Sequence, residues 1–157
     1  MLGGELWREF SLVKDLNLFG LDIKPCTSDV YKHFIVGDAK SLPFPDKSFD
    51  IVFSNSVLEH VGDFEQQKLM ANEIRRVGKR YFVQVPNKHF PIEPHYFIPF
   101  LQYLPRKLQK WITRLFFRES EDIYLPTKKQ LKLLFPDAEI ISEKFLLFTK
   151  SFYIYRK

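Results

Sequence analysis

The chain has 157 residues, of which 45% are hydrophobic and 17% aromatic, and this supplies enough apolar material for one domain with a packed core. Its formal net charge of +5 permits an anionic partner but is far from a polybasic nucleic-acid-binding composition. The single cysteine excludes an intrachain disulfide framework, and no apolar run reaches the ~18 residues of a membrane-spanning helix, so we expect a cytoplasmic protein.

The first half of the sequence predicts short apolar strands that alternate with helices. In order, these are a helix at 5–15, strands at 18–23, 33–36 and 49–53, a helix at 63–77 and a strand at 80–85. The two prolines in residues 41–46 predict a turn between the second and third strands. This alternation is typical of an α/β protein with a mostly parallel sheet.

The second half departs from that alternation. Residues 88–125 are rich in proline and aromatic residues and look like an insertion, within which we expect a helix at 106–117. Thr127 is then a helix cap, with Gln130 as its capping-box partner. Strands at 139–147 and 151–156 form an antiparallel pair, so the predicted fold is a single α/β domain over residues 1–157 with a mixed sheet.

Polar side chains stand where the predicted strands end. Asp22 and Asp38 each follow an apolar run, and Ser54, Asn55 and Ser56 follow the next one. We expect strands 33–36 and 49–53 in one parallel sheet, with these residues lining a crevice along its carboxyl edge. One carboxylate suits the two hydroxyls of a ribose and the other an exocyclic amine, although both aspartates also fit a plainer role as turn residues.

The block 37–61, GDAKSLPFPDKSFDIVFSNSVLEHV, resembles the central signature of class I S-adenosylmethionine-dependent methyltransferases, in particular the type 11 branch. The resemblance runs from about Gly3 to Asn87. It implies a Rossmann-like sheet, S-adenosylmethionine as cofactor, no metal site, and methyl transfer to a small-molecule, glycan or lipid-linked acceptor.

The same resemblance implies the roles of individual residues. Asp22 would bind the ribose, Asp38 the adenine amine, and His60 would lie at the mouth of the site as a candidate general base. The other implied cofactor contacts are Gly3, Gly4, Ile23, Ala39, Leu42, Ser54, Asn55 and Ser56. His60 also fits a structural role at the start of the following helix.

One part of the family pattern is missing from the sequence. The family's central first strand and its glycine-rich turn should precede the first helix, and only Gly3-Gly4 matches the end of that turn. A sheet without its central strand leaves two neighbours with unpaired backbone groups. We therefore expect the neighbouring strands to close together, another chain to supply the strand, or a marginally stable protein that binds cofactor poorly.

The insertion would form a cap on the acceptor side. Glu93 and His95 are its candidate substrate-binding residues, with a solvated loop as the plainer interpretation. Residues 106–118 interleave five cations with aromatic and aliphatic residues, which suits either an anionic membrane surface or packing on the domain. Nucleic acid is a weaker alternative, because no recognition motif accompanies these cations.

Three functional hypotheses stay open at this point. The first is a methyltransferase, the second a methyltransferase-like binding or scaffold module that has lost its cofactor, and the third a peripheral membrane protein. The acceptor and the oligomeric state are not encoded in any motif.

Overall fold

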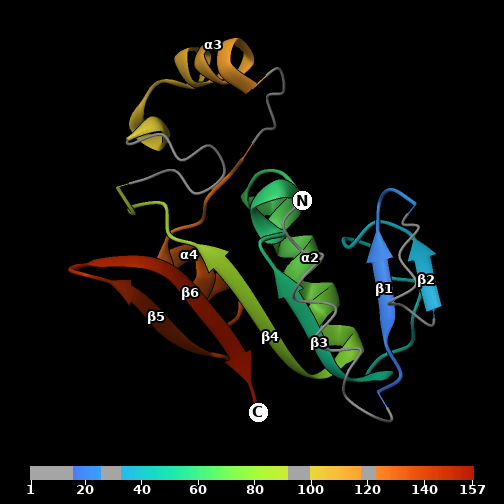
Figure 1. The fold of residues 1–157 in the computed structure, drawn as a ribbon. Helices are drawn as coiled ribbons and strands as arrows, with labels where there is room; N and C mark the ends of the chain where they lie inside the picture. Colours follow the sequence, from blue (N-terminus) through green and yellow to red (C-terminus); the bar gives the residue numbers. More distant parts are fainter. Residues whose placement is uncertain (1–15, 26–32, 92–99, 118–122) are drawn as a thin grey trace.

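The computed structural model describes residues 16–25, 33–91, 100–117 and 123–157 (Figure 1). The predicted helix at 5–15 lies outside these ranges. The strands are β1 (Phe19–Asp22), β2 (His33–Val36), β3 (Phe49–Asn55), β4 (Gly78–Pro86), β5 (Glu139–Phe145) and β6 (Phe148–Arg156). The helices are α2 (Phe64–Val77), α3 (Arg106–Phe117) and α4 (Lys128–Leu134), with short 3-10 helices η1 (Leu58–His60) and η2 (Leu101–Tyr103). Among the described residues, no helix combines the length and apolar character needed to cross a bilayer.

The larger sheet has four strands in the order β3–β4–β6–β5. Strands β3 and β4 are parallel, whereas β6 runs antiparallel to both β4 and β5. The protein therefore has an α/β fold with a mixed sheet and a C-terminal antiparallel pair, as the sequence predicts. The end of that pair differs, because Leu146 and Leu147 form a tight turn rather than the end of a strand.

Two capped helices, α2 and α4, cover one face of this sheet. The side chain of Asp63 accepts a hydrogen bond from the Gln66 amide at the start of α2, and Thr127 and Gln130 form the predicted capping box of α4. The apolar stripes of both helices pack against alternate residues of β4 and β6. The buried core contains Met70, Ala71, Ile74, Tyr81, Val83, Val85, Leu131, Leu134, Phe135, Phe152 and Ile154.

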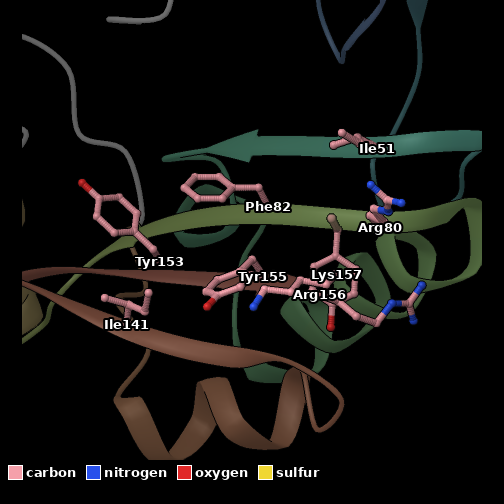
Figure 2. A pocket seen from close by; sticks show the side chains of 9 residues that line it. Ile51, Arg80, Phe82, Ile141, Tyr153, Tyr155, Arg156 and Lys157 are labelled. Atoms are coloured by element: carbon pink, nitrogen blue, oxygen red, sulfur yellow. The ribbon is translucent and has the colours of Figure 1, made fainter.

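An aromatic row lies on the opposite face of the larger sheet. The ring of Phe82 stacks on Phe53 at a centroid distance of 5.5 Å and lies 5.6 Å from the ring of Tyr153. Figure 2 shows Phe82, Tyr153 and Tyr155 projecting from this face, beside a shallow hollow of about 420 Å³. Ile51, Arg80 and Arg156 also line the hollow, which places it toward the amino ends of β3 and β4.

The expectation that strands 33–36 and 49–53 share one sheet is wrong. Among the described strands, β1 pairs only with β2, in parallel, and β3 pairs with β4 in the other sheet. Apolar runs with polar ends indicate parallel strands, but they do not determine which strands are neighbours. The expected pairing of β1 with β3 is therefore not observed among the described strands.

Among the described residues, aromatic side chains join the two sheets at the start of β1 and β3. The ring of Phe49 lies 5.4 Å from that of Phe19 and 4.7 Å from that of Phe44, both in edge-on geometry. Such aromatic contacts stabilise by roughly 0.5–1.5 kcal/mol each beyond area burial. Figure 1 shows β1 and β3 pointing the same way, so their carboxyl ends lie toward the same side of the molecule.

Candidate functional site

The two predicted nucleoside-binding carboxylates stand at the ends of neighbouring strands. The Gly37 amide donates to the Asp22 carbonyl at 2.9 Å, which extends the β1–β2 ladder and places Asp38 beside the end of β1. Asp22 is exposed, and its carboxylate accepts from the Lys24 amide at 3.0 Å. Asp38 accepts from the Lys40 amide at 2.9 Å and pairs with the Lys40 ammonium at 3.4 Å. Each carboxylate thus closes a local turn, and each is still accessible to solvent and can accept further hydrogen bonds.

The loop that follows Asp38 is fixed by two charged residues of α2. The Leu42 amide donates to the Glu73 carboxylate at 2.6 Å, and Glu73 accepts from Arg76 at 2.7 Å and 2.8 Å. Arg76 also donates to the carbonyls of Leu42 and Phe44 and to the Asp46 carboxylate. We call this set of contacts between Glu73, Arg76 and loop 41–46 the loop clamp.

The loop clamp changes the acidity of its own members. Hydrogen bonds from Arg76 hold the pKa of Glu73 below its ordinary value of 4.5, against the opposite effect of partial burial. Hydrogen bonding to Glu73 and Asp46 likewise raises the pKa of Arg76. Both side chains are therefore charged at neutral pH, and they determine where Leu42 lies.

The end of β3 carries a second polar group in a constrained backbone. Ser54 is buried, and its hydroxyl has no hydrogen-bond partner among the described residues. Ser56 adopts a φ of 51°, which is unusual for a residue other than glycine. Its amide donates to the Gln84 carbonyl at 3.1 Å and its hydroxyl to the Gln84 side-chain oxygen at 2.8 Å. Gln84 of β4 thus holds the turn that leads from β3 to η1.

His60 lies at the end of η1 and is exposed. Its neighbour Glu59 is fully buried, and the Glu59 carbonyl accepts from the Tyr124 amide at 2.9 Å. The Tyr124 carbonyl in turn accepts from the buried Gln67 side chain at 2.6 Å. These contacts fasten the segment after the insertion to the end of β3.

The structure brings together only part of the predicted site. Asp22, Asp38, Ala39 and Leu42 are near one another along the chain or across the β1–β2 ladder. Ser54 and Asn55 instead end β3 of the other sheet, and Ser56 and His60 follow it. Ile23 is exposed directly after β1. Gly3, Gly4, Glu93 and His95 lie outside the described residues.

Several residues of this region were missed by the sequence reasoning. Glu73 and Arg76, three positions apart on a predicted helix, look like an ordinary surface ion pair. Gln84 looks like one polar residue within a strand, and Glu59 looks like an ordinary charged residue at the start of a helix. Their roles depend on contacts between segments about 30 to 65 residues apart, for which the sequence carries no local signal.

The hollow on the sheet face lies at the other end of the strands from these residues. Ile51 and Arg80 lie near the first residues of β3 and β4, whereas Ser54–Ser56 lie at the last residues of β3 and directly after it. The hollow is lined mainly by apolar and aromatic side chains and by cations. We therefore place the candidate site at the carboxyl edge, because the carboxylates of Asp22 and Asp38 and the polar residues Ser54–Ser56 lie there.

The residues at this edge fit a nucleoside. Two accessible carboxylates on adjacent strands can accept hydrogen bonds from a diol and from an amine, and a clamped loop with Leu42 supplies an apolar neighbour for a ring. The buried Ser54 hydroxyl offers a further polar atom at the end of β3. This donor and acceptor set suits an uncharged nucleoside portion better than a phosphate, which the carboxylates would repel.

Comparison with known proteins agrees with the α/β fold described above. Residues 3–81 match a family model described as a methyltransferase domain, of type 11. A structure of a SAM-dependent methyltransferase from Methanosarcina mazei aligns with a TM-score of 0.53 and 18% identity, over 87% of this chain and 79% of that one. Protein PH0226 from Pyrococcus horikoshii aligns with a TM-score of 0.59 and 18% identity, over 97% of this chain and 74% of that one.

Two curated relatives share part of the sequence. Both are uncharacterized proteins of Mycobacterium tuberculosis, from strains H37Rv and CDC 1551, and each is 37% identical over 54 residues. The matched region makes up 34% of this chain and 18% of each relative. The chain therefore matches less than a fifth of the length of these relatives.

Proposed function

The chain belongs to the type 11 methyltransferase domain family, which its residues 3–81 match, and we propose that it transfers a methyl group from S-adenosylmethionine to a small-molecule, glycan or lipid-linked acceptor. The observation that carries this proposal is the pair of accessible carboxylates at the carboxyl ends of β1 and β2. Asp22 would accept hydrogen bonds from the ribose and Asp38 from the adenine amine, with Ala39 and Leu42 beside the ring.

The remaining roles concern the methionine end and the acceptor. Ser54, Asn55 and Ser56 would lie near the methionine portion, together with Gly3 and Gly4, and Ile23 would lie beside the ribose. When bound, the cofactor supplies a methyl group on a sulfonium, which is already a good leaving group. The protein then has to align the acceptor and, where the acceptor is a hydroxyl or amine, remove its proton.

His60 is the proposed base for that proton. It is exposed beside the Ser54–Ser56 segment, and an imidazole accepts protons near neutral pH. Glu93 and His95 are the proposed acceptor contacts in the insertion. A cytoplasmic location, with a peripheral contact to the membrane through residues 106–118, accompanies this proposal.

The test is cofactor binding by isothermal titration calorimetry with S-adenosylmethionine and its demethylated product. The Asp22→Ala variant removes at least one hydrogen bond to a charged acceptor, which costs about 1.5–3 kcal/mol, so the Kd should rise by roughly one to two decades. Asp50→Ala is the matched control, because Asp50 is also an exposed aspartate of a strand but pairs with Lys79. Equal affinities of the wild type and Asp22→Ala would refute the proposed ribose site.

The second candidate is a scaffold module that keeps the fold without the cofactor. The division of the sheet between β1–β2 and β3 favours it, because the two halves of the proposed site are not joined by backbone hydrogen bonds. The same calorimetry separates the two candidates. Binding of the cofactor in the micromolar range supports the methyltransferase, and no detectable heat with a correctly melting protein supports the scaffold.

A further inference from the structure

Three apolar side chains of helix α3 are exposed to solvent. Trp111 and Leu115 are 61% and 62% exposed and Leu108 is 41% exposed, whereas Thr113, on the other side of the helix, is 4% exposed. The Thr113 hydroxyl donates to the carbonyls of Gln109 and Lys110 within the helix, which explains how a polar residue occupies the buried side. Leu108, Trp111 and Leu115 are three and four positions apart, so they form one continuous stripe.

The turn between β5 and β6 shows a second exposed apolar feature. Leu146 and Leu147 are 83% and 94% exposed, and Leu146 adopts a φ of 53°. Two-residue hairpin turns normally contain glycine, asparagine or aspartate, because these residues tolerate positive φ and water. Two leucines at this position contradict the local preference, and such conflicts are expected where a surface has a function.

Both features lie at the carboxyl edge of the sheet, on the side of the proposed site. The insertion that contains α3 leaves β4 at its carboxyl end, where Pro86 pairs with Ser151. The Asn87 amide donates to the Lys150 carbonyl at 2.9 Å, so the start of the insertion is bonded to β6 close to the leucine turn. Figure 1 shows α3 beyond this end of β4. We call the set of Leu108, Trp111, Leu115, Leu146 and Leu147 the apolar edge.

Charge accompanies the apolar edge. Residues 94–118 contain five lysine or arginine residues and no aspartate or glutamate, although three acidic residues follow within 119–122. Lys107 and Arg114 are exposed on α3, about one turn from Trp111. A helix with an apolar face beside cations is the pattern that lies at the surface of anionic bilayers.

We propose that the apolar edge docks on an anionic lipid bilayer, with Trp111, Leu115 and the leucine turn entering the headgroup region and the α3 cations at the lipid phosphates. This inference specifies the peripheral membrane contact proposed above for residues 106–118, adds the leucine turn to it, and does not depend on the proposed methyl transfer. It also indicates that an acceptor would reach the site from the membrane side, because the docking surface and the proposed site share one edge.

The experiment is flotation of the full chain with vesicles of phosphatidylcholine alone or with about 30% phosphatidylglycerol, at low and high salt. We expect binding to the anionic vesicles that weakens with salt, and little binding to phosphatidylcholine. In a Trp7→Phe background Trp111 is the single tryptophan, and its emission should shift to the blue and be quenched by brominated lipid.

Three paired variants test the residues. Trp111→Ser with Leu115→Ser should weaken binding at least tenfold. Lys107→Gln with Arg114→Gln should weaken it about 25-fold, at roughly fivefold for each cation. Leu146→Gly with Leu147→Ser places residues in the β5–β6 turn that such turns favour. Vesicle binding should therefore fall, while the melting temperature stays at the wild-type value. The controls are Leu133→Ser and Lys129→Gln with Lys132→Gln, which remove an exposed leucine and two lysines from α4.

The outcomes separate clearly. Loss of binding in the three apolar-edge and α3 variants, with normal binding by the α4 controls, supports the proposal. Absence of wild-type binding to anionic vesicles at low salt overturns it. Equal loss in the α4 controls also overturns it, because binding would then not be specific to the apolar edge and the α3 cations. Binding of an RNA or DNA oligomer without binding of vesicles overturns it as well, because charge alone would then explain the association.

Discussion

The loop clamp offers a quantitative test through the substitution Glu73→Gln. The Glu73 carboxylate accepts from the Leu42 amide and from two nitrogens of Arg76 at 2.6–2.8 Å, and glutamine keeps one acceptor oxygen but no charge. Hydrogen bonds to charged groups contribute about 1.5–3 kcal/mol. Because the side chains of Glu73 and Arg76 are 17% and 32% exposed, solvent screening reduces this, and we expect a loss of about 1–2 kcal/mol.

That loss corresponds to a fall of roughly 2–8 °C in the melting temperature of a protein of this size. The pH dependence follows from the lowered pKa of Glu73. A carboxyl whose pKa is lower in the folded state stabilises fully above its ordinary pKa of 4.5, and the contribution is lost as the pH falls through the folded-state pKa. The difference between the wild type and Glu73→Gln should therefore be full at pH 7 and shrink below about pH 4.5.

The assay is thermal unfolding followed by circular dichroism between acidic and neutral pH. Glu65→Gln is the control, because Glu65 is an exposed glutamate in the first turn of the same helix. If Glu73→Gln melts with the wild type at pH 7, the loop clamp does not stabilise the fold. If the difference persists unchanged at acidic pH, the lowered pKa is not its cause.

Two further substitutions test buried polar groups. Ser54→Ala removes a buried hydroxyl without a partner among the described residues, so it should raise the melting temperature by about 2–4 °C, and a fall would show that the hydroxyl is satisfied. Tyr81→Phe removes the hydrogen bond that the buried Tyr81 donates to Asp137 at 2.8 Å. Denaturant titration should show a loss of about 1 kcal/mol, and an unchanged midpoint would mean that this bond adds nothing to stability.

Much of the fold could be predicted from local signals. The strand at 33–36, the helix at 106–117 and the capping box of Thr127 and Gln130 are confirmed, because apolar runs, helical spacing and cap residues act within a few positions. The carboxylates of Asp22 and Asp38 lie at strand ends as expected. Their binding roles stay a prediction.

The sequence could not show how distant segments meet. The sequences of β1 and β3 do not predict that these strands pair with different partners, because strand pairing depends on contacts between remote segments. The spacing of Trp111 and Leu115 predicts a helix stripe but not which side of the helix is covered. In the sequence Arg76 looks like a solvated cation, whereas in the structure it donates hydrogen bonds to the carbonyls of Leu42 and Phe44 in loop 41–46.

The division of the β-structure has a consequence for cooperativity. Since β1–β2 and the larger sheet share no backbone ladder among the described strands, each can open without breaking the hydrogen bonds of the other. Amide hydrogen exchange should then report two units, with the amides of β1 and β2 exchanging faster than those of β4 and β6. A ligand that touched Asp22 and the Ser54–Ser56 segment at once would link these units, and its binding would slow exchange in β1 and β2 far from any atom that it contacts.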